Sequence, residues 1–195
     1  KTLEEPPPDT WIVMVTSRPE RLLQTVRSRC EHVRFGPLLD DEIREWISQT
    51  MPDVSNVDWI VQWADGAPGM AMLAEETSLA EYAHELQAIL DDLDHGRWNQ
   101  DFCVRIAEFI NKRSEQVVKA NSKASKDMAN KQAAAIILRL LGSHVRRRLA
   151  TVGPDDQESG RHLWALANRI SETEDQLQRG LNLKHVLESL GAEWC

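Results

Sequence analysis

The sequence has few of the residues that build metal sites and disulfide frameworks. Its 195 residues include three cysteines, Cys30, Cys103 and Cys195, which lie far apart and are odd in number. Because no Cys-x-x-Cys pair is present, neither a zinc site nor a disulfide framework is indicated. The simplest interpretation is a set of reduced thiols in a cytoplasmic protein. We see no signal-like N-terminus and no apolar run of membrane-spanning length, so we expect no membrane partner.

Acidic residues outnumber basic ones. There are 23 Lys and Arg residues against 31 Asp and Glu, which gives a net charge of −8. Affinity for a nucleic-acid backbone comes from many cationic contacts, so direct DNA binding by this chain would need a local patch. The dense basic run is residues 146–148 together with Arg139. A helix spreads such residues around its axis, so we expect a solvated face or an intersubunit salt bridge there.

Sequence motifs for nucleotide and metal binding are missing as well. Nothing in these 195 residues matches the phosphate-binding loop G-x-x-x-x-G-K-[ST]. We therefore expect the chain alone not to bind or hydrolyse ATP, to carry no cofactor, and not to be an enzyme by itself. The histidines are scattered, and none has a recognised ligand spacing. His144, on an apolar helix face, is expected to be a hydrogen-bonded core residue and not a ligand.

Helical periodicity dominates from about residue 38 onward. With 42% hydrophobic residues, the chain can build one or two domains with real cores. The spacing predicts a mainly α fold, with three short helices over residues 38–78 and a bundle of five amphipathic helices over residues 79–195. The expected inner faces are Ile43, Trp46 and Ile47; Trp59, Ile60 and Trp63; Leu86, Ile89, Leu90 and Leu93; Phe102, Ile106, Phe109 and Ile110; Ile136, Ile137, Leu140, Leu141 and Val145; Leu163, Leu166, Ile170 and Leu177; and Leu183, Val186, Leu187 and Leu190.

The first 37 residues have a different pattern, one of a strand, a helix and a strand. The apolar run 11–15 suggests a strand buried on both faces of a parallel sheet. Pro19 suits the first turn of a helix that continues to about Ser28. Residues 33–35 predict a second, short strand. No other strand is available to complete a sheet, so we expect residues 1–37 to be poorly supported when the chain folds alone.

Three motifs in this segment carry a family resemblance. They are Lys1-Thr2-Leu3-Glu4-Glu5-Pro6-Pro7, Thr16-Ser17-Arg18-Pro19-Glu20-Arg21-Leu22-Leu23 and Arg27-Ser28-Arg29-Cys30. The stretch resembles the clamp-loader branch of the AAA+ ATPases, and within it the delta-prime family of bacterial DNA polymerase III subunits. The resemblance implies an incomplete end of an AAA+ core over residues 1–37, a three-helix lid over 38–78 and a helical collar over 79–195. Because the sequence begins inside a motif, we expect a fragment whose phosphate-binding loop lies upstream.

The resemblance also implies roles for individual residues. Arg29 would be an arginine finger, supplied in trans to the ATP of a neighbouring subunit, with Ser28 and Cys30 completing its motif. From spacing alone, a surface arginine paired with a carboxylate is the commoner situation, and the resemblance reverses that preference. Thr16 and Ser17 occupy the place of the polar sensor 1 residue. Hydroxyls at strand ends commonly satisfy local backbone groups, and we favour that structural interpretation here.

One departure from the family pattern bears on the type of subunit. Hydrolysing motors carry a sensor 2 arginine in the region of residues 66–71, where this sequence has Met70 and, close by, Met72. The departure favours a non-hydrolysing stator in a five-subunit ring with the gamma/tau and delta subunits, which loads a sliding clamp onto primed DNA. Two alternatives stay open. One is the tau/gamma ATPase subunit of the same loader, and the other is a helical adaptor unrelated to ATP.

Overall fold

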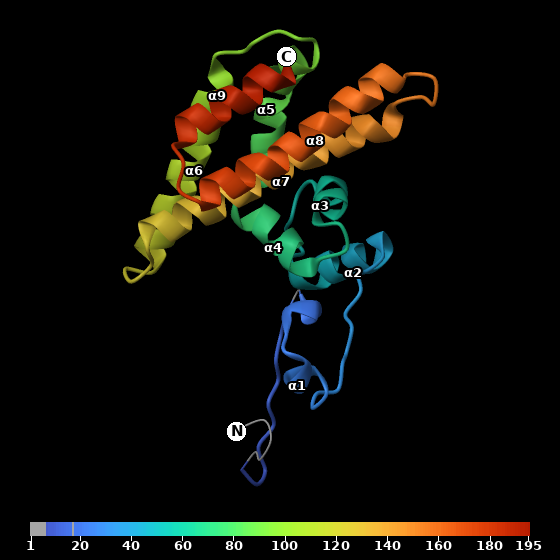
Figure 1. The fold of residues 1–195 in the computed structure, drawn as a ribbon, viewed down its shortest axis with the longest axis vertical. Coiled ribbons are helices and arrows are strands. Elements are labelled where there is room, and N and C mark those ends of the chain that lie inside the picture. The colour runs from blue at the N-terminus through green and yellow to red at the C-terminus, as the bar shows by residue number, and fades with distance from the viewer. Residues whose placement is uncertain (1–6, 17) are drawn as a thin grey trace. The chain divides into compact units, whose positions relative to one another are not determined.

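The computed structural model describes residues 7–16 and 18–195, and over these residues the protein is built from helices (Figure 1). Nine α helices and one 3₁₀ helix form in the described part, and no β-strand does. The mainly α fold expected from the sequence is therefore confirmed. The chain divides into two compact units, residues 1–37 and residues 38–195.

In the first unit, the two expected strands are absent from the described residues. The side chains of Trp11, Val15 and Phe35 are 94%, 95% and 94% exposed. A strand needs neighbouring strands to accept and donate its backbone hydrogen bonds, and no described segment supplies them. The strand predictions for residues 11–15 and 33–35 are therefore wrong for this structure. The cause is the missing sheet, which also made us expect residues 1–37 to be poorly supported.

The helix expected from Pro19 to Ser28 forms in two short pieces. The 3₁₀ helix η1 spans Pro19–Arg21 and helix α1 spans Gln24–Arg27. Between them, Leu22 and Leu23 are extended, with ψ of 143° and 140°. Leu23 is 72% exposed. Neither leucine belongs to the hydrophobic core, so apolar spacing alone does not hold the segment helical.

Limited trypsin digestion of the chain should cut first within residues 18–34. This segment holds several arginines and exposed backbone, whereas the helices after residue 38 share a buried core. Mass spectrometry of the early products should find a resistant fragment beginning near residue 35. Early cleavage at Arg161, Arg169 or Arg179, inside α8 or at its end, would contradict this expectation.

Three short helices open the second unit. They are α2 (Asp40–Thr50), α3 (Val57–Ala64) and α4 (Pro68–Glu76). The Glu42 carboxylate accepts a hydrogen bond from the backbone N–H of Leu39 at 2.7 Å, which satisfies one of the free donors at the start of α2. Asn56 precedes α3 directly, but its side chain does not cap the helix. Its amide donates instead to Glu81 Oε1 at 3.0 Å, and its backbone is left-handed with φ of 60°.

Five longer helices complete the second unit. They are α5 (Leu79–Asp94), α6 (Asp101–Ala120), α7 (Lys126–Thr151), α8 (Gln157–Gln178) and α9 (Leu183–Trp194). The long helices α7 and α8 run side by side, α6 packs against α7, and α9 packs against α6 and α8 (Figure 1). None of the helices among the described residues has both the length and the apolar character that a membrane span requires.

The predicted inner faces form one continuous hydrophobic core that runs from α2 to α9. All of the predicted residues are buried except Trp46, Trp59 and Leu183, which are partly buried against that core. The core contains residues on both sides of position 78. The boundary that we expect there, between a lid and a collar, stays a prediction.

Candidate functional site

The Ser28-Arg29-Cys30 motif follows α1 directly and continues its turn. The backbone N–H of Arg29 donates to Val26 O at 3.1 Å, and that of Cys30 donates to Arg27 O at 3.4 Å. Ser28 and Arg29 are exposed, and Cys30 is half-buried. The motif therefore places its arginine on the surface and turns its thiol partly inward.

Two side chains of the motif share one acceptor. Arg29 Nη1 donates to the Thr25 carbonyl oxygen at 2.9 Å, and Ser28 Oγ donates to the same oxygen at 3.3 Å. Thr25 lies in the last turn of α1, where backbone carbonyls lack helical partners. These contacts position the arginine side chain over the end of the helix.

The two residues at the expected sensor 1 place have different outcomes. Thr16 is exposed, and its hydroxyl oxygen accepts the backbone N–H of Arg18 at 3.0 Å. This is the local backbone contact that the structural interpretation of Thr16 expects. Ser17 lies outside the described residues.

The methionines at the expected sensor 2 place lie on α4. Met70 is partly buried against the core, whereas Met72 is 43% exposed. Met70 also lines a groove of about 890 Å³ formed along α4, α6, α7 and α8. A thioether is only a weak hydrogen-bond acceptor, so neither side chain can neutralise a phosphate as an arginine would.

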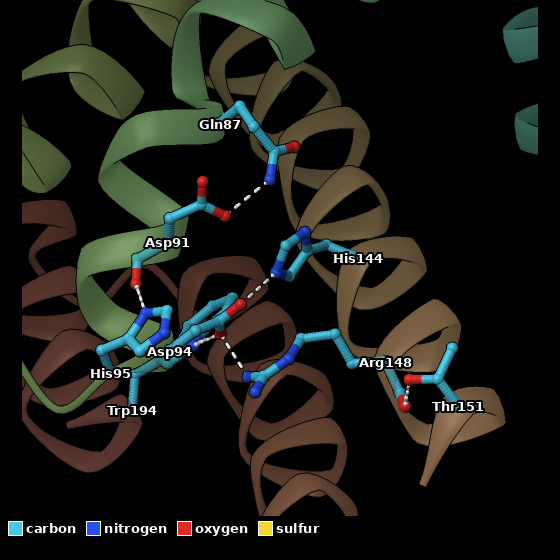
Figure 2. A network of polar contacts seen from close by, with 8 residues as sticks. All are labelled: Gln87, Asp91, Asp94, His95, His144, Arg148, Thr151 and Trp194. Carbon is cyan, nitrogen blue, oxygen red and sulfur yellow. Dashed lines mark hydrogen bonds and ion pairs between the residues drawn. The ribbon is translucent and has the colours of Figure 1, made fainter.

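A buried polar cluster ties α5, α7 and α9 together at the C-terminal end of α5 (Figure 2). It consists of Asp94, His144, Arg148 and Trp194, and we call it the Asp94 cluster. Asp94 Oδ2 lies 2.8 Å from His144 Nε2, and Asp94 Oδ1 accepts from Trp194 Nε1 at 2.8 Å and from Arg148 Nη1 at 2.6 Å. The Asp94 and His144 side chains are only 7% and 8% exposed.

The surroundings of Asp94 favour its ionised form. Burial acts to raise the pKa of the Asp94 carboxyl. Hydrogen bonds from His144 and Trp194, with the charges of His144 and Arg148, act in the opposite direction and lower the pKa below its usual value. The carboxylate is therefore charged at neutral pH and holds donors from two other helices.

The basic run on α7 is engaged within the chain. Arg146 pairs with Asp65 at 3.2 Å, and Arg148 pairs with Asp94 at 2.6 Å. The Arg139 guanidinium lies 5.5 Å from the ring centre of Trp63, in cation–π geometry. Arg146 stays 65% exposed in its ion pair, as a solvated face would have it, and an intersubunit salt bridge in this run stays a prediction.

Sequence reasoning found only part of the Asp94 cluster. His144 is a hydrogen-bonded core residue, as expected. Its acceptor Asp94 lies 50 positions earlier, at the end of α5, and Trp194 lies 100 positions after Asp94. Local sequence patterns cannot predict contacts between residues that are 50 or 100 positions apart. Among the described residues, no group of three or more His, Cys, Asp or Glu side chains could hold a metal ion.

Comparison with known proteins places the similarity in the N-terminal region. Residues 1–39 match the family model described as DNA polymerase III, delta subunit. That range contains the whole Ser28-Arg29-Cys30 motif. No solved structure gives a significant match to the chain.

Two curated relatives carry the same subunit name. The DNA polymerase III subunit delta' of Escherichia coli (strain K12) is 39% identical over 74 residues, which are 37% of this chain and 22% of the relative. The subunit delta' of Bacillus subtilis (strain 168) is 47% identical over 45 residues, 23% of this chain and 14% of the relative. The matched part thus spans less than a quarter of either relative. Over that part, the chain is similar to the delta-prime subunits of bacterial DNA polymerase III.

Proposed function

We propose that the chain is part of a delta-prime-type subunit of the DNA polymerase III clamp loader, a stator that does not itself hydrolyse ATP. In this role Arg29 is an arginine finger that acts in trans on the ATP of a neighbouring gamma/tau subunit. The subunit works in the cytoplasm, in a five-membered ring with gamma/tau and delta, which loads the sliding clamp onto primed DNA.

One observation carries the proposal, namely the family match over residues 1–39. It coincides with the motif-rich segment and includes Arg29. The 74 matched residues of the Escherichia coli relative exceed these 39, so the similarity reaches beyond the segment. Both relatives are named as subunit delta', which favours the stator over the tau/gamma motor and over an unrelated helical adaptor.

The geometry of the motif suits a finger. Arg29 is exposed at the end of a helical turn, where another chain can approach it. A guanidinium at the γ-phosphate stabilises the charge that develops in phosphoryl transfer. One of its acceptors is the Thr25 carbonyl oxygen, and charge-assisted hydrogen bonds to phosphate oxygens are stronger than a bond to a neutral carbonyl. Ser28, bound to the same carbonyl, helps to fix the turn.

The rest of the chain fits the scaffold part of the role. In the proposal, residues 1–37 are the incomplete end of the AAA+ core, α2–α4 are the lid and α5–α9 are the collar. Met70 and Met72, in place of a sensor 2 arginine, are consistent with a subunit that does no hydrolysis. The continuous core from α2 to α9 supports a rigid body, as a stator requires.

Reconstitution of the loader tests the assembly role. The full-length protein that contains this chain should co-elute with the delta and gamma/tau subunits of its own organism as one complex. Size-exclusion chromatography with light scattering gives the mass of that complex. Elution of the protein alone from every mixture would contradict the stator, and retention of ATP by the protein alone would favour a nucleotide-binding subunit.

A further inference from the structure

A second cavity lies between α3, α5 and α7, away from the Arg29 motif in sequence and built wholly within residues 38–195. Its volume is about 310 Å³, at the small end of the range for ligand pockets. We call it the α5–α7 pocket. Its polar lining consists of Asn56, Glu81, His84, Gln87, His144 and Arg147.

Two pairs of polar residues face each other across this pocket. His84 and Gln87 are three positions apart on α5, and His144 and Arg147 are three positions apart on α7. Residues with this spacing lie on the same face of a helix. All four line the pocket. Two imidazoles, of His84 and His144, and the guanidinium of Arg147 therefore lie around one small space.

Arg147 differs from the arginines on either side of it. Arg146 and Arg148 pair with Asp65 and Asp94, whereas Arg147 has no ion pair or hydrogen bond within the described part of the chain. Arg147 is exposed, and the partial burial of its guanidinium lowers its pKa, with no carboxylate paired to it. A guanidinium without a carboxylate partner can bind an external anion.

His144 lines the floor of the pocket and belongs to the Asp94 cluster as well. Its side chain is 8% exposed, and its Nε2 faces Asp94. Figure 2 shows the other ring nitrogen directed away from Asp94, toward the side on which Gln87 lies. The Asp94 contact therefore fixes the orientation of the ring and directs Nδ1 toward the pocket, where Nδ1 donates to an anion only when both ring nitrogens carry protons.

The remaining lining is compatible with a small charged ligand. Glu81, the one acidic lining residue, accepts a hydrogen bond from Asn56 at 3.0 Å, which fixes the position of its carboxylate and leaves its charge in place. Trp59, Leu90 and Leu140 supply an apolar wall on which the body of a ligand can pack. Desolvation by such a wall strengthens the attraction between a guanidinium and an oxyanion.

We propose that the α5–α7 pocket binds a small oxyanion, a phosphate or a carboxylate group, through Arg147, His84 and His144. Arg147 supplies the charge and paired N–H donors, which suit the planar or tetrahedral oxygens of such a group. His84 and His144 line the same space from opposite helices. The proposal concerns a different region from the arginine finger and does not depend on it.

Titration of the isotope-labelled chain with inorganic phosphate, and separately with acetate, tests the pocket by NMR at constant pH and ionic strength. The ring C–H signals of His84 and His144 should shift and saturate with at least one of the two anions. The anion that saturates identifies the favoured oxyanion. Linear drift of both signals with both anions would overturn the proposal.

Matched variants separate pocket binding from general charge. Arg147→Gln should weaken the binding of the saturating anion about tenfold or more, the loss expected when one charge-assisted contact is removed. Arg146→Gln, which removes the neighbouring charge, should keep the wild-type affinity. Equal affinity of the two variants would overturn the proposal. Both residues are exposed, and circular dichroism should show both variants folded. Because no loader subunit is present, the result is independent of ring assembly.

Discussion

Replacement of Asp94 by alanine is expected to lower the free energy of unfolding by about 3 kcal/mol, because a buried charge pair loses one partner. The carboxylate accepts from His144, Arg148 and Trp194, and it is 7% exposed. Its removal leaves the indole N–H of Trp194, itself on a side chain that is 1% exposed, without its acceptor. Urea denaturation, followed by circular dichroism and tryptophan fluorescence, measures the loss.

A neighbouring carboxylate on the same helix provides the control. Asp91 is exposed and accepts only from the side chain of Gln87 and, through its backbone oxygen, from His95. Asp91→Ala should change the unfolding free energy by less than about 0.5 kcal/mol. Similar losses of unfolding free energy for the two variants would show that the Asp94 cluster contributes no more to stability than an exposed carboxylate does.

The contribution of Asp94 should also depend on pH. The folded state lowers the pKa of this carboxyl below its usual value of 3.8, so the unfolded state binds the proton more tightly. The stabilisation is therefore complete above that usual value and is lost as the pH falls through the folded value. The stability difference between wild type and Asp94→Asn should shrink below about pH 4. A constant difference at all pH values would contradict the charged form.

Replacement of Arg29 by alanine is expected to lower ATP turnover at the neighbouring subunit's site about a thousand-fold, the scale of an arginine finger. The reason is that the transition-state charge on the γ-phosphate would lose its guanidinium. Arg29 is exposed and packs into no core, so its removal should leave the fold and the assembly intact. Single-turnover hydrolysis by the reconstituted loader, primed DNA and clamp included, measures the rate.

Arg27 offers a matched control for Arg29. It lies two residues earlier, is also exposed, and ends α1. Arg27→Ala should keep turnover near that of the wild type. Arg29→Lys should recover little, because a lysine cannot present paired donors to phosphate oxygens. Unchanged turnover in Arg29→Ala, with the ring assembled, would refute the finger.

The helices after residue 38 could be read from the sequence because their signal is local. Apolar residues at helical spacing on α5 and α6, such as Leu86, Leu93, Phe102 and Ile106, are all buried in the structure. Residues 95–100, 121–125 and 152–156 connect these helices. A helix that satisfies its own backbone hydrogen bonds needs only one apolar stripe to find a core.

The first 37 residues show the opposite case. Trp11, Val13 and Val15 have the composition of a buried strand, yet they are exposed here. Strand pairing depends on partner strands that no short sequence window contains. A strand pattern therefore shows that a segment can form a strand, but not that it does so in a given structure. The family resemblance of the same segment was nevertheless readable, because it depends on residue identity and not on packing.

The amino-acid sequence by itself determined the helical class, the positions of the helices after residue 38 and the similarity to delta-prime subunits. These properties are encoded in short-range spacing and in contiguous motifs. Only the tertiary structure decided which polar groups meet: Asp94 with His144 and Trp194, Arg146 with Asp65, and Arg147 with an open pocket. Contacts between residues so far apart along the chain are set by how the helices pack, and side-chain spacing along one helix carries no information about the helix opposite.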